Sequence, residues 1–273
     1  MKEGVPADHP RAESLRIREK LIENFRMGVV AIAGLMAHGR GEAFDYLLGE
    51  ETTESALRAI RAAAAAMLLA ERPVISVNGN VAALVAEDVV RLAEATGAKI
   101  EVNLFYRTWE REQAIKRVLE EAGAKEVLGV GDAASARIPE VCSERRRVDP
   151  RGILAADVVL VPLEDGDRAE ALRRMGKVVI AVDLNPLSRT ARAASITIVD
   201  NVVRALPLLV QEAYRLRGER PEVLKEIVSG FDNGEALSDA VRIINERLSR
   251  IAGEGACIPE GAEVYRRLEG EER

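Results

Sequence analysis

The chain opens with the hydrophobic spacing of helices. From Ala12 to Phe25, apolar residues recur every three or four positions, as they do on the buried face of an amphipathic helix. Two further segments, Gly28 to Leu48 and Thr52 to Glu71, also read as helices. Pro10 suits the first turn of the opening helix, and Thr53 suits the cap of the third. The beginning of the chain is therefore predicted to be helical.

From Pro73 onward, short β-branched runs alternate with helical segments, which is typical of a parallel sheet whose strands are buried on both faces. The predicted strands are Val74–Val77, Lys99–Leu104, Glu126–Val130, Asp157–Val161, Lys177–Val182 and Ser195–Val199. The predicted helices between them are Ala82–Thr96, Glu110–Ala122, Arg168–Met175 and a short piece after Thr190. This alternation predicts an α/β fold with a doubly wound, mostly parallel sheet.

Beyond Val203 the pattern is again helical, through Pro207–Leu216, Pro221–Val228 and Ala236–Ile251. No internal repeat, low-complexity tract or long Gly/Ser linker divides the chain. We therefore expect a single domain over residues 1–273. Its expected parts are a helical N-terminal part at about 10–71, an α/β core at about 73–204, a helical C-terminal part at about 205–251 and a loose tail at about 252–273.

Charge and composition exclude several classes of protein. The chain carries 39 basic and 45 acidic side chains, a net charge of −6, so it lacks the positive surplus that binding to nucleic-acid phosphates requires. The longest apolar stretch, Met27 to Ala37, is too short to cross a bilayer, and no cationic leader precedes it. We expect a cytoplasmic protein with neither a membrane nor a nucleic-acid partner. Cys142 and Cys257 lack a metal-binding spacing, which favours reduced thiols.

Polar residues follow the predicted strands directly. In open α/β sheets, ligands bind in the crevice beyond the carboxyl ends of the strands. After Val182, the residues Asp183, Asn185, Arg189 and Thr190 supply a carboxylate, an amide, a guanidinium group and a hydroxyl group. Together these groups predict a site for a phosphate-bearing ligand.

Three other polar segments each leave two interpretations open. Asn78-Gly79-Asn80 can form an anion cradle at a helix N-terminus or a turn with an Asn cap. Arg145-Arg146-Arg147 can grip phosphate or form a solvated loop. The turn with Glu164, Asp165 and Asp167 can hold Mg²⁺ or face solvent.

Glycines carry two further indications. Gly39 and Gly41 flank Arg40 within an apolar helical pattern, which predicts a bend that presents Arg40. His38 beside them can act as an acid or base near neutral pH, or can be structural. The chain lacks the GxxxxGK[ST] loop, and the glycines at 129 and 131 are not followed by the third glycine of the dinucleotide fingerprint.

Six distinctive strings occur in order along the chain. They are His9-Pro10-Arg11, Gly34-Leu-Met-Ala-His-Gly-Arg-Gly-Glu-Ala-Phe-Asp-Tyr46, Val74-Ile-Ser-Val-Asn-Gly-Asn80, Asn103-Leu-Phe-Tyr-Arg-Thr108, Val161-Pro-Leu-Glu-Asp-Gly-Asp-Arg168 and Asp183-Leu-Asn-Pro-Leu-Ser-Arg-Thr190. Together they resemble the archaeal phosphopantothenate synthetases, which are 4-phosphopantoate:β-alanine ligases of coenzyme A biosynthesis. The resemblance extends from about His9 to about Leu248.

This resemblance implies a Rossmann-like homodimer that uses ATP, with Mg²⁺, to join 4-phosphopantoate to β-alanine. The reaction would pass through a phosphopantoyl-adenylate and release AMP and diphosphate. The nucleotide contacts that the resemblance implies are Arg18, Arg40, Asp183, Leu184, Asn185, Arg189, Thr190, Asn201 and Val202.

Position at the sheet edge alone predicts Asn78, Asn80 and Arg107 as contacts of 4-phosphopantoate. The residue that takes a proton from the β-alanine amine is not indicated. Two other functions fit the same sheet. One is an NAD(P)-dependent oxidoreductase with Asp183 on the ribose, and the other is a domain that senses a nucleotide without turnover.

Overall fold

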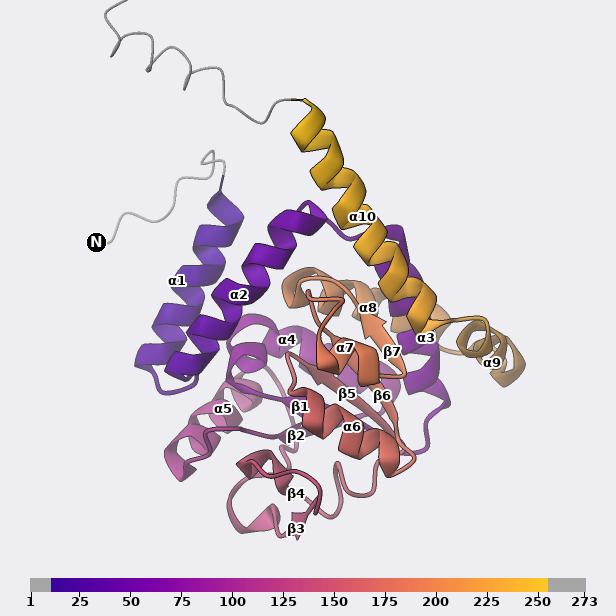
Figure 1. Cartoon of the computed structure of the whole chain (residues 1–273). Helices are drawn as coiled ribbons and strands as arrows, with labels where there is room; N and C mark the ends of the chain where they lie inside the picture. Colours follow the sequence, from indigo (N-terminus) through magenta and orange to yellow (C-terminus); the bar gives the residue numbers. More distant parts are fainter. Residues whose placement is uncertain (1–10, 255–273) are drawn as a thin grey trace, which may run out of the picture.

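A computed structural model describes residues 11–254 of the chain. A five-stranded parallel sheet forms the centre of the molecule, with helices around it (Figure 1). The strands lie in the order β2-β1-β5-β6-β7. Their bounds are β1 (Pro73–Val77), β2 (Lys99–Val102), β5 (Val158–Pro162), β6 (Val178–Val182) and β7 (Ile196–Ile198). The predicted α/β fold with a doubly wound parallel sheet is confirmed.

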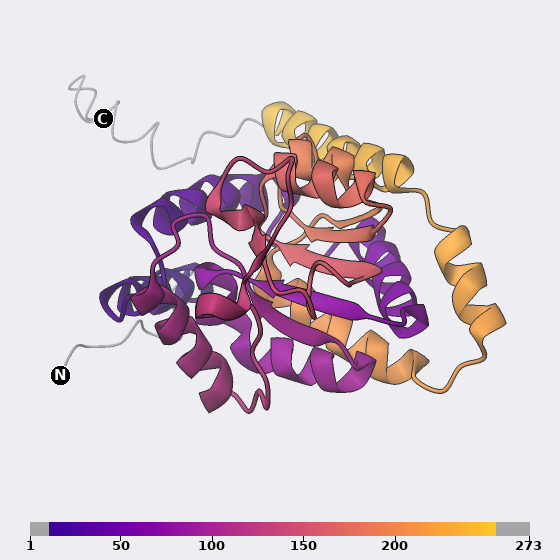
Figure 2. The same ribbon diagram turned by 90° about the horizontal axis from the view of Figure 1, so that it is seen from below.

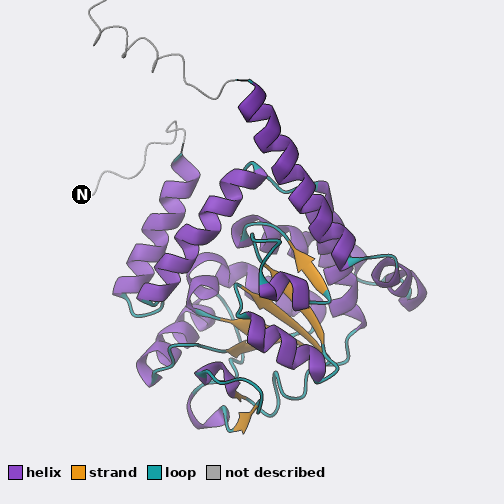
Figure 3. Ribbon diagram, viewed as in Figure 1, coloured by secondary structure: helices purple, strands orange, loops and turns teal. Residues whose placement is uncertain are grey.

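Three helices precede the sheet, as the opening pattern predicts (Figure 3). They are α1 (Ala12–Arg26), α2 (Ile32–Leu48) and α3 (Glu54–Leu69). The helices within and after the sheet are α4 (Gly79–Thr96), α5 (Trp109–Glu121), α6 (Gly166–Arg174), α7 (Arg189–Ala193), α8 (Val202–Leu216), α9 (Pro221–Ser229) and α10 (Asn233–Gly253). The last of these, α10, packs on α2 and α3. The C-terminal helix of the described chain therefore contacts helices that precede the sheet.

The strands bury alternate side chains on the two faces of the sheet. Ile75, Leu160 and Ile180 belong to a core that they share with α3, α4 and α8. Val159 and Val179 belong to a separate core that they share with α6. This alternation is the period of two that a pleated strand imposes, and Figure 2 shows the strands between the two layers of helices.

The connection from β2 to β5 contains a short antiparallel hairpin. Its parts are η1 (Gly131–Ala133), β3 (Ala136–Arg137), η2 (Glu144–Arg146) and β4 (Arg147–Val148), where η marks a 3₁₀-helix.

The predicted strand Glu126–Val130 just before this hairpin is wrong, because only an isolated bridge between Leu128 and Glu101 forms there. Gly129 ends the pairing with a φ of 74°, a left-handed conformation that favours glycine.

Helix α2 runs continuously through Gly39 and Gly41, so the predicted bend is wrong. Each glycine costs a helix only about 1 kcal/mol relative to alanine. The helix also packs against α1 and α10. A different glycine of α2 has a clear purpose, since a Cβ atom at Gly34 would lie 2.3 Å from the Asn80 Oδ1 atom of α4.

Helix caps largely follow the expected chemistry. The Thr53 side chain accepts a hydrogen bond from the Ala56 backbone, which confirms the predicted cap of α3. Asn201 caps α8, so this helix begins at Val202 and the predicted start at Pro207 is wrong.

Several expectations fall outside the described residues: the role of Pro10, the state of Cys257 and the tail beyond residue 254. The start of that tail, predicted at about 252, is instead helical, because α10 continues to Gly253. Cys142 is exposed and unpaired. None of the helices between residues 11 and 254 is both long and apolar enough to span a membrane.

Candidate active site

The order of the strands determines where a ligand can bind. From β1 the chain turns to one side to form β2, and it then crosses to the other side of β1 to form β5. Such a reversal opens a crevice between the loops that follow the two central strands, here β1 and β5. The polar segments predicted from the sequence follow these strands and their neighbours, so they meet at one edge.

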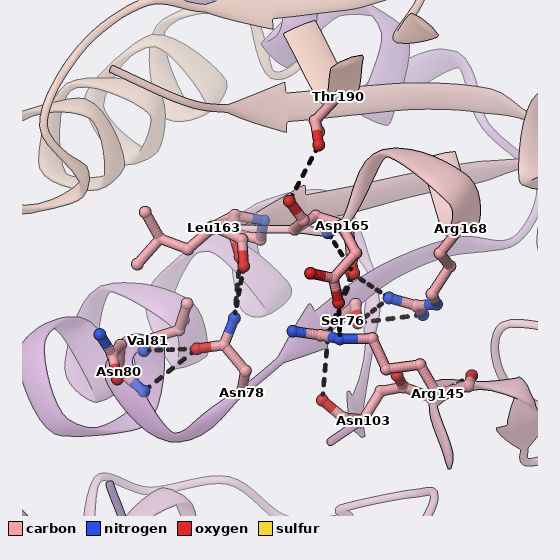
Figure 4. A network of polar contacts seen from close by, with 12 residues as sticks. Ser76, Asn78, Asn80, Val81, Asn103, Arg145, Leu163, Asp165, Arg168 and Thr190 are labelled. Atoms are coloured by element: carbon pink, nitrogen blue, oxygen red, sulfur yellow. Dashed lines mark hydrogen bonds and ion pairs between the residues drawn. The ribbon is translucent and has the colours of Figure 1, made fainter. Parts of the chain in front are cut away.

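Asn78 joins the loops on the two sides of this crevice (Figure 4). Its Oδ1 atom accepts hydrogen bonds from the backbone of Asn80 and Val81, both at 3.1 Å, and so caps α4. Its Nδ2 group donates to the carbonyls of Pro162 and Leu163, at 3.0 and 3.2 Å. Of the two interpretations left open, the structure supports the Asn cap. The amides that an anion cradle would need are already bonded to Asn78.

Asn80 ties α4 to α2. Its Nδ2 group donates to the Gly34 carbonyl at 2.9 Å, and its side chain is buried. Gly79 makes the close approach possible, because a Cβ atom there would lie 2.2 Å from the Val29 carbonyl oxygen. Both asparagines predicted to bind 4-phosphopantoate therefore lie near the reversal of strand order between β1 and β5, which we call the switch point. Both side chains already hold neighbouring segments together.

The acidic turn after β5 faces arginines. Glu164, with a side chain 1% exposed, forms an ion pair with the fully buried Arg168, whose guanidinium group also donates to the Ser76 hydroxyl at 3.2 Å. Arg145 pairs with Glu164 at 3.2 Å and with Asp165 at 2.7 Å. Figure 4 shows both arginines reaching toward this turn. Neither alternative from the sequence, Mg²⁺ ligands or a solvated turn, describes Glu164.

The segment after β6 is folded around the Asp183 carboxylate. Asp183 accepts hydrogen bonds from the Asn185 backbone at 2.9 Å and from the Ser188 hydroxyl, which also caps α7. Burial raises the pKa of Asp183 above its usual range, and the positive charge of Arg40 opposes this shift. Arg40 and Asp183 belong to segments that touch, because the Leu184 Cδ1 atom lies 3.6 Å from the Cβ position of Gly41.

The start of α7 is joined to the turn after β5. The buried Thr190 donates its hydroxyl to the Glu164 carbonyl at 2.9 Å. Its neighbour Arg189 extends along the surface, where its side chain is 65% exposed and pairs with Glu170 at 2.7 Å. Exposed pairs of this kind contribute little to stability, so Arg189 can exchange Glu170 for a ligand phosphate at small cost.

The end of β7 is bonded to α2. Asn201 donates to the Asp45 carboxylate at 2.8 Å, and Arg204 binds the same carboxylate. Val202 is buried as the first residue of α8. These contacts fix α2 over the ends of β6 and β7. Leu184 completes this arrangement by lying 3.6 Å from the Cβ position of Gly41.

Helix α1 adds Arg18 to the same region. Its guanidinium group donates to Glu42 of α2 at 2.7 and 3.1 Å, and this bond raises the pKa of Arg18. Beside it, His38 lines a small cavity of about 30 Å³ that Asn201 also borders. Burial lowers the pKa of His38, and its Nε2 atom has no hydrogen-bond partner within residues 11–254.

The structure thus groups most of the predicted nucleotide contacts around the ends of β6 and β7. Arg107 is different, because its side chain is 3% exposed and paired with Glu112. It also donates to the carbonyls of Gly129 and Arg147, so its guanidinium group is already bonded to the connection between β2 and β5. These contacts give Arg107 a structural role in joining two segments of the chain.

Four residues at this edge were not among the predicted site residues: Ser76, Asp45, Arg204 and the buried Arg168. Two signals were available. Ser76 is a polar residue inside an otherwise hydrophobic strand, and Arg168 stands four residues after Glu164, the spacing of an ion pair on one helical turn. Asp45 and Arg204 are 159 positions apart, so no local pattern connects them.

Comparison with known proteins gives a consistent result. A family model described as phosphopantothenate/pantothenate synthetase matches residues 55–247. The 4-phosphopantoate–β-alanine ligase of Thermococcus kodakarensis is 57% identical over 253 residues, covering 92% of this chain and 96% of the relative. The ligase of the same name from Methanosarcina mazei is 55% identical over 250 residues, covering 92% and 98%. That of Methanospirillum hungatei is 51% identical over 249 residues, covering 90% and 99%.

Proposed function

The chain belongs to the phosphopantothenate/pantothenate synthetase family, and we propose that it joins 4-phosphopantoate to β-alanine, in coenzyme A biosynthesis, through an acyl-adenylate. The observation that carries this proposal is that full-length relatives more than half identical to this chain have that ligase as their name. The crevice at the β1/β5 switch point supports it, because such crevices bind nucleotides in related sheets.

The chemistry explains why a nucleotide is needed. A carboxylate does not react with an amine at neutral pH until one of its oxygens becomes part of a leaving group. In the proposed reaction, a carboxylate oxygen of 4-phosphopantoate attacks the α-phosphorus of ATP, and diphosphate leaves. The amine nitrogen of β-alanine then attacks the acyl carbon, loses a proton and displaces AMP. The protein would contribute mainly by positioning and by offsetting negative charge.

Residue roles in the nucleotide site are proposals that the geometry supports. Arg40 and Arg189 would offset the charge of the phosphates, while Asp183 and Asn185 would bind the ribose or base through polar contacts. Thr190 would bind a phosphate oxygen by turning its hydroxyl proton away from the Glu164 carbonyl, to which it donates in the structure. The remaining proposed nucleotide contacts are Arg18, Leu184, Asn201 and Val202.

Asn78, Asn80 and Arg107 stay predictions as contacts of 4-phosphopantoate. The contacts of their side chains favour holding the edge in shape over direct binding. Alanine substitutions separate the two roles. Loss of direct binding would weaken 4-phosphopantoate alone, whereas loss of shape would also lower thermal stability and the affinity for ATP.

The described residues do not form a metal centre of their own. No group of three or more His, Cys, Asp or Glu side chains within residues 11–254 is placed to hold a metal ion. Glu164 and Asp165, which the sequence offered as ligands, face Arg145 and Arg168. Mg²⁺ is therefore proposed to be held chiefly by the phosphates of ATP, as is common for this ion.

A homodimer is also proposed, and an exposed apolar surface supports it. Arg111 donates to the Val29 carbonyl at 3.1 Å and to the Tyr106 carbonyl, so the α1–α2 turn touches the loop after β2. Large apolar side chains are exposed on these segments, which is typical of an interface. They are Met27, Ile32, Met36, Tyr106 and Trp109, each between 55% and 73% exposed. Light scattering on wild type and on Met36→Glu would test this, since a dimer should give way to a monomer.

The function itself is tested by mixing the purified protein with ATP, Mg²⁺, 4-phosphopantoate and β-alanine. Products are followed by mass-resolved chromatography, with each substrate omitted in turn. AMP formed in equal amount with 4′-phosphopantothenate supports the ligase and its adenylate. ADP in place of AMP would replace the adenylate with an acyl-phosphate, and a lack of turnover would favour nucleotide sensing.

A further inference from the structure

A cavity of about 360 Å³ lies beside the β3–β4 hairpin, beyond the carboxyl end of β2. This volume is within the range of about 300–1,000 Å³ that small-molecule sites occupy. Arg137, Arg146 and Arg147 line it together with Asp132 and Glu144. We call it the arginine cavity. In Figure 1 the hairpin lies below β1 and β2, on the far side of the molecule from α10.

The backbone that carries these arginines is held rigidly from behind. The fully buried Asn103 donates its Nδ2 group to the carbonyls of Arg145 and Arg147, at 3.1 and 3.0 Å. Arg107 donates to the same Arg147 carbonyl at 3.2 Å. Its partner Glu112 accepts from the Gly131 backbone at 2.6 Å, which holds the backbone next to Asp132, another lining residue of the arginine cavity.

The arginine side chains themselves are left open. Within residues 11–254, Arg137 forms no side-chain hydrogen bond or ion pair. Arg146 has only Glu144 at 3.7 Å, beyond hydrogen-bond distance, and its buried Nε has no acceptor. Arg147 donates only to the Gly131 carbonyl, at 3.3 Å. Three guanidinium groups on a fixed backbone, with most donors unused, are suited to an anion with several oxygens.

We infer that the arginine cavity binds the phosphate group of 4-phosphopantoate; this assignment rests on the proposed function. A phosphate monoester carries close to two negative charges at neutral pH, because its second pKa is about 6. Arginine matches such a group through paired N–H donors, whereas a carboxylate or hydroxyl would engage fewer of them.

The position of the arginine cavity favours the acid substrate over ATP. The proposed nucleotide contacts gather at β6 and β7, and β6 is three strands from β2. At about 4.8 Å per strand, this separation is about 14 Å. A substrate with its phosphate in the arginine cavity would point its carboxylate toward the switch point, between the two regions. Arg145, next to Arg146, reaches that point through Glu164.

The test deletes the phosphate from the ligand and the arginine from the protein, separately and together. Binding of 4-phosphopantoate, pantoate and ATP is measured by titration calorimetry on wild type, Arg146→Gln and Arg137→Gln. Arg217→Gln, an exposed change at the end of α8, is the matched control. Thermal unfolding of every variant confirms that it folds.

We expect Arg146→Gln to weaken 4-phosphopantoate by about 10–100-fold, as loss of a charged hydrogen bond does, and to leave pantoate and ATP unchanged. Arg146→Lys should restore part of the affinity. An equal loss of affinity for pantoate, or no loss of affinity for 4-phosphopantoate in either glutamine variant, would overturn the inference. Turnover by the wild type would still support the proposed function in that case. A wild type that neither binds nor converts 4-phosphopantoate would overturn both.

Discussion

Two groups of arginines at the same edge of the sheet are arranged in opposite ways. At the switch point, Arg168 is fully buried and its charge is met by Glu164 and the Ser76 hydroxyl. In the arginine cavity, Arg137 and Arg146 are not fully buried and have no carboxylate within hydrogen-bond distance. The charges of the first group are paired within the folded chain, although the Arg168 Nε atom has no hydrogen-bond partner among residues 11–254, whereas the second group has no bonded carboxylate.

Burial explains the difference. A fully buried charge must be paired when the protein folds, because its desolvation is not repaid otherwise. A charge that still reaches water needs no protein partner, and it can exchange water for a ligand later. The pairing of an arginine in the folded chain therefore separates arginines that support the structure from arginines that are available for binding.

The largest effect should come from breaking the buried group. Arg168→Met leaves the Glu164 carboxylate buried with one cation fewer, and we expect the free energy of unfolding to fall by about 3–5 kcal/mol in urea denaturation. The double variant Arg168→Met/Glu164→Gln is the control. It should lose clearly less than the sum of the single changes, because the unpaired charge is then removed. Additive losses would mean that the two side chains are not coupled.

Glu101 is a buried acid that, unlike Glu164, has no bonded cation, so it tests the effect of burial without pairing. Burial raises the pKa of Glu101 to about 7 from 4.5, although the backbones of Ile153 and Asp149 donate to it. The folded state therefore holds a proton that the unfolded state has lost between these two pH values. Stability should fall as pH rises through this window, by on the order of 3 kcal/mol in total.

The measurement is urea denaturation of wild type and Glu101→Gln at several pH values from 4.5 to 8. The variant loses one backbone acceptor, so it should be less stable at the acid end by about 1–2 kcal/mol. Its stability should change less with pH than that of the wild type. Parallel pH profiles for the two proteins would show that another group titrates in this range.

Sequence patterns located much of this edge in advance. Strand β6 and the polar segment that follows it were predicted within one residue, because a run of buried β-branched residues and the turn residues after it are local signals. The same holds for the Thr53 cap of α3, which depends on residues within a few positions of one another. The Asn cap after β1 was one of two interpretations that the spacing left open, and only the structure separates it from an anion cradle.

The sequence could not predict that the three consecutive arginines have different contacts. Arg145 pairs with Glu164, 19 positions away, while Arg146 and Arg147 line the arginine cavity. Only the tertiary contacts that fix their backbone, chiefly from Asn103, decide which way each side chain points. Arg107 shows the same limit, since its position after a strand predicts a ligand contact, whereas only the structure shows that its side chain is buried against Glu112.

A smaller effect is expected for Asn78→Ala. Loss of a helix cap costs about 1 kcal/mol, and here the links to the Pro162 and Leu163 carbonyls are lost as well. Thr53→Ala removes a cap of the same type away from the switch point. Asn78→Ala should lose at least as much thermal stability as Thr53→Ala, and only Asn78→Ala should reduce ligase turnover. Equal turnover in the two would show that the crevice does not depend on this bridge.

The smallest effect on stability should be that of Arg146→Gln. Its side chain is 39% exposed and has no strong partner, so the free energy of unfolding should change by less than about 0.5 kcal/mol. The Arg168 and Arg146 variants are then compared in two measurements, stability by urea denaturation and ligand binding by calorimetry. Arg168 should control folding, and Arg146 should control binding of the phosphate. A loss above about 2 kcal/mol in Arg146→Gln would place this arginine with the structural group, since only charges that are paired on folding are so costly to remove.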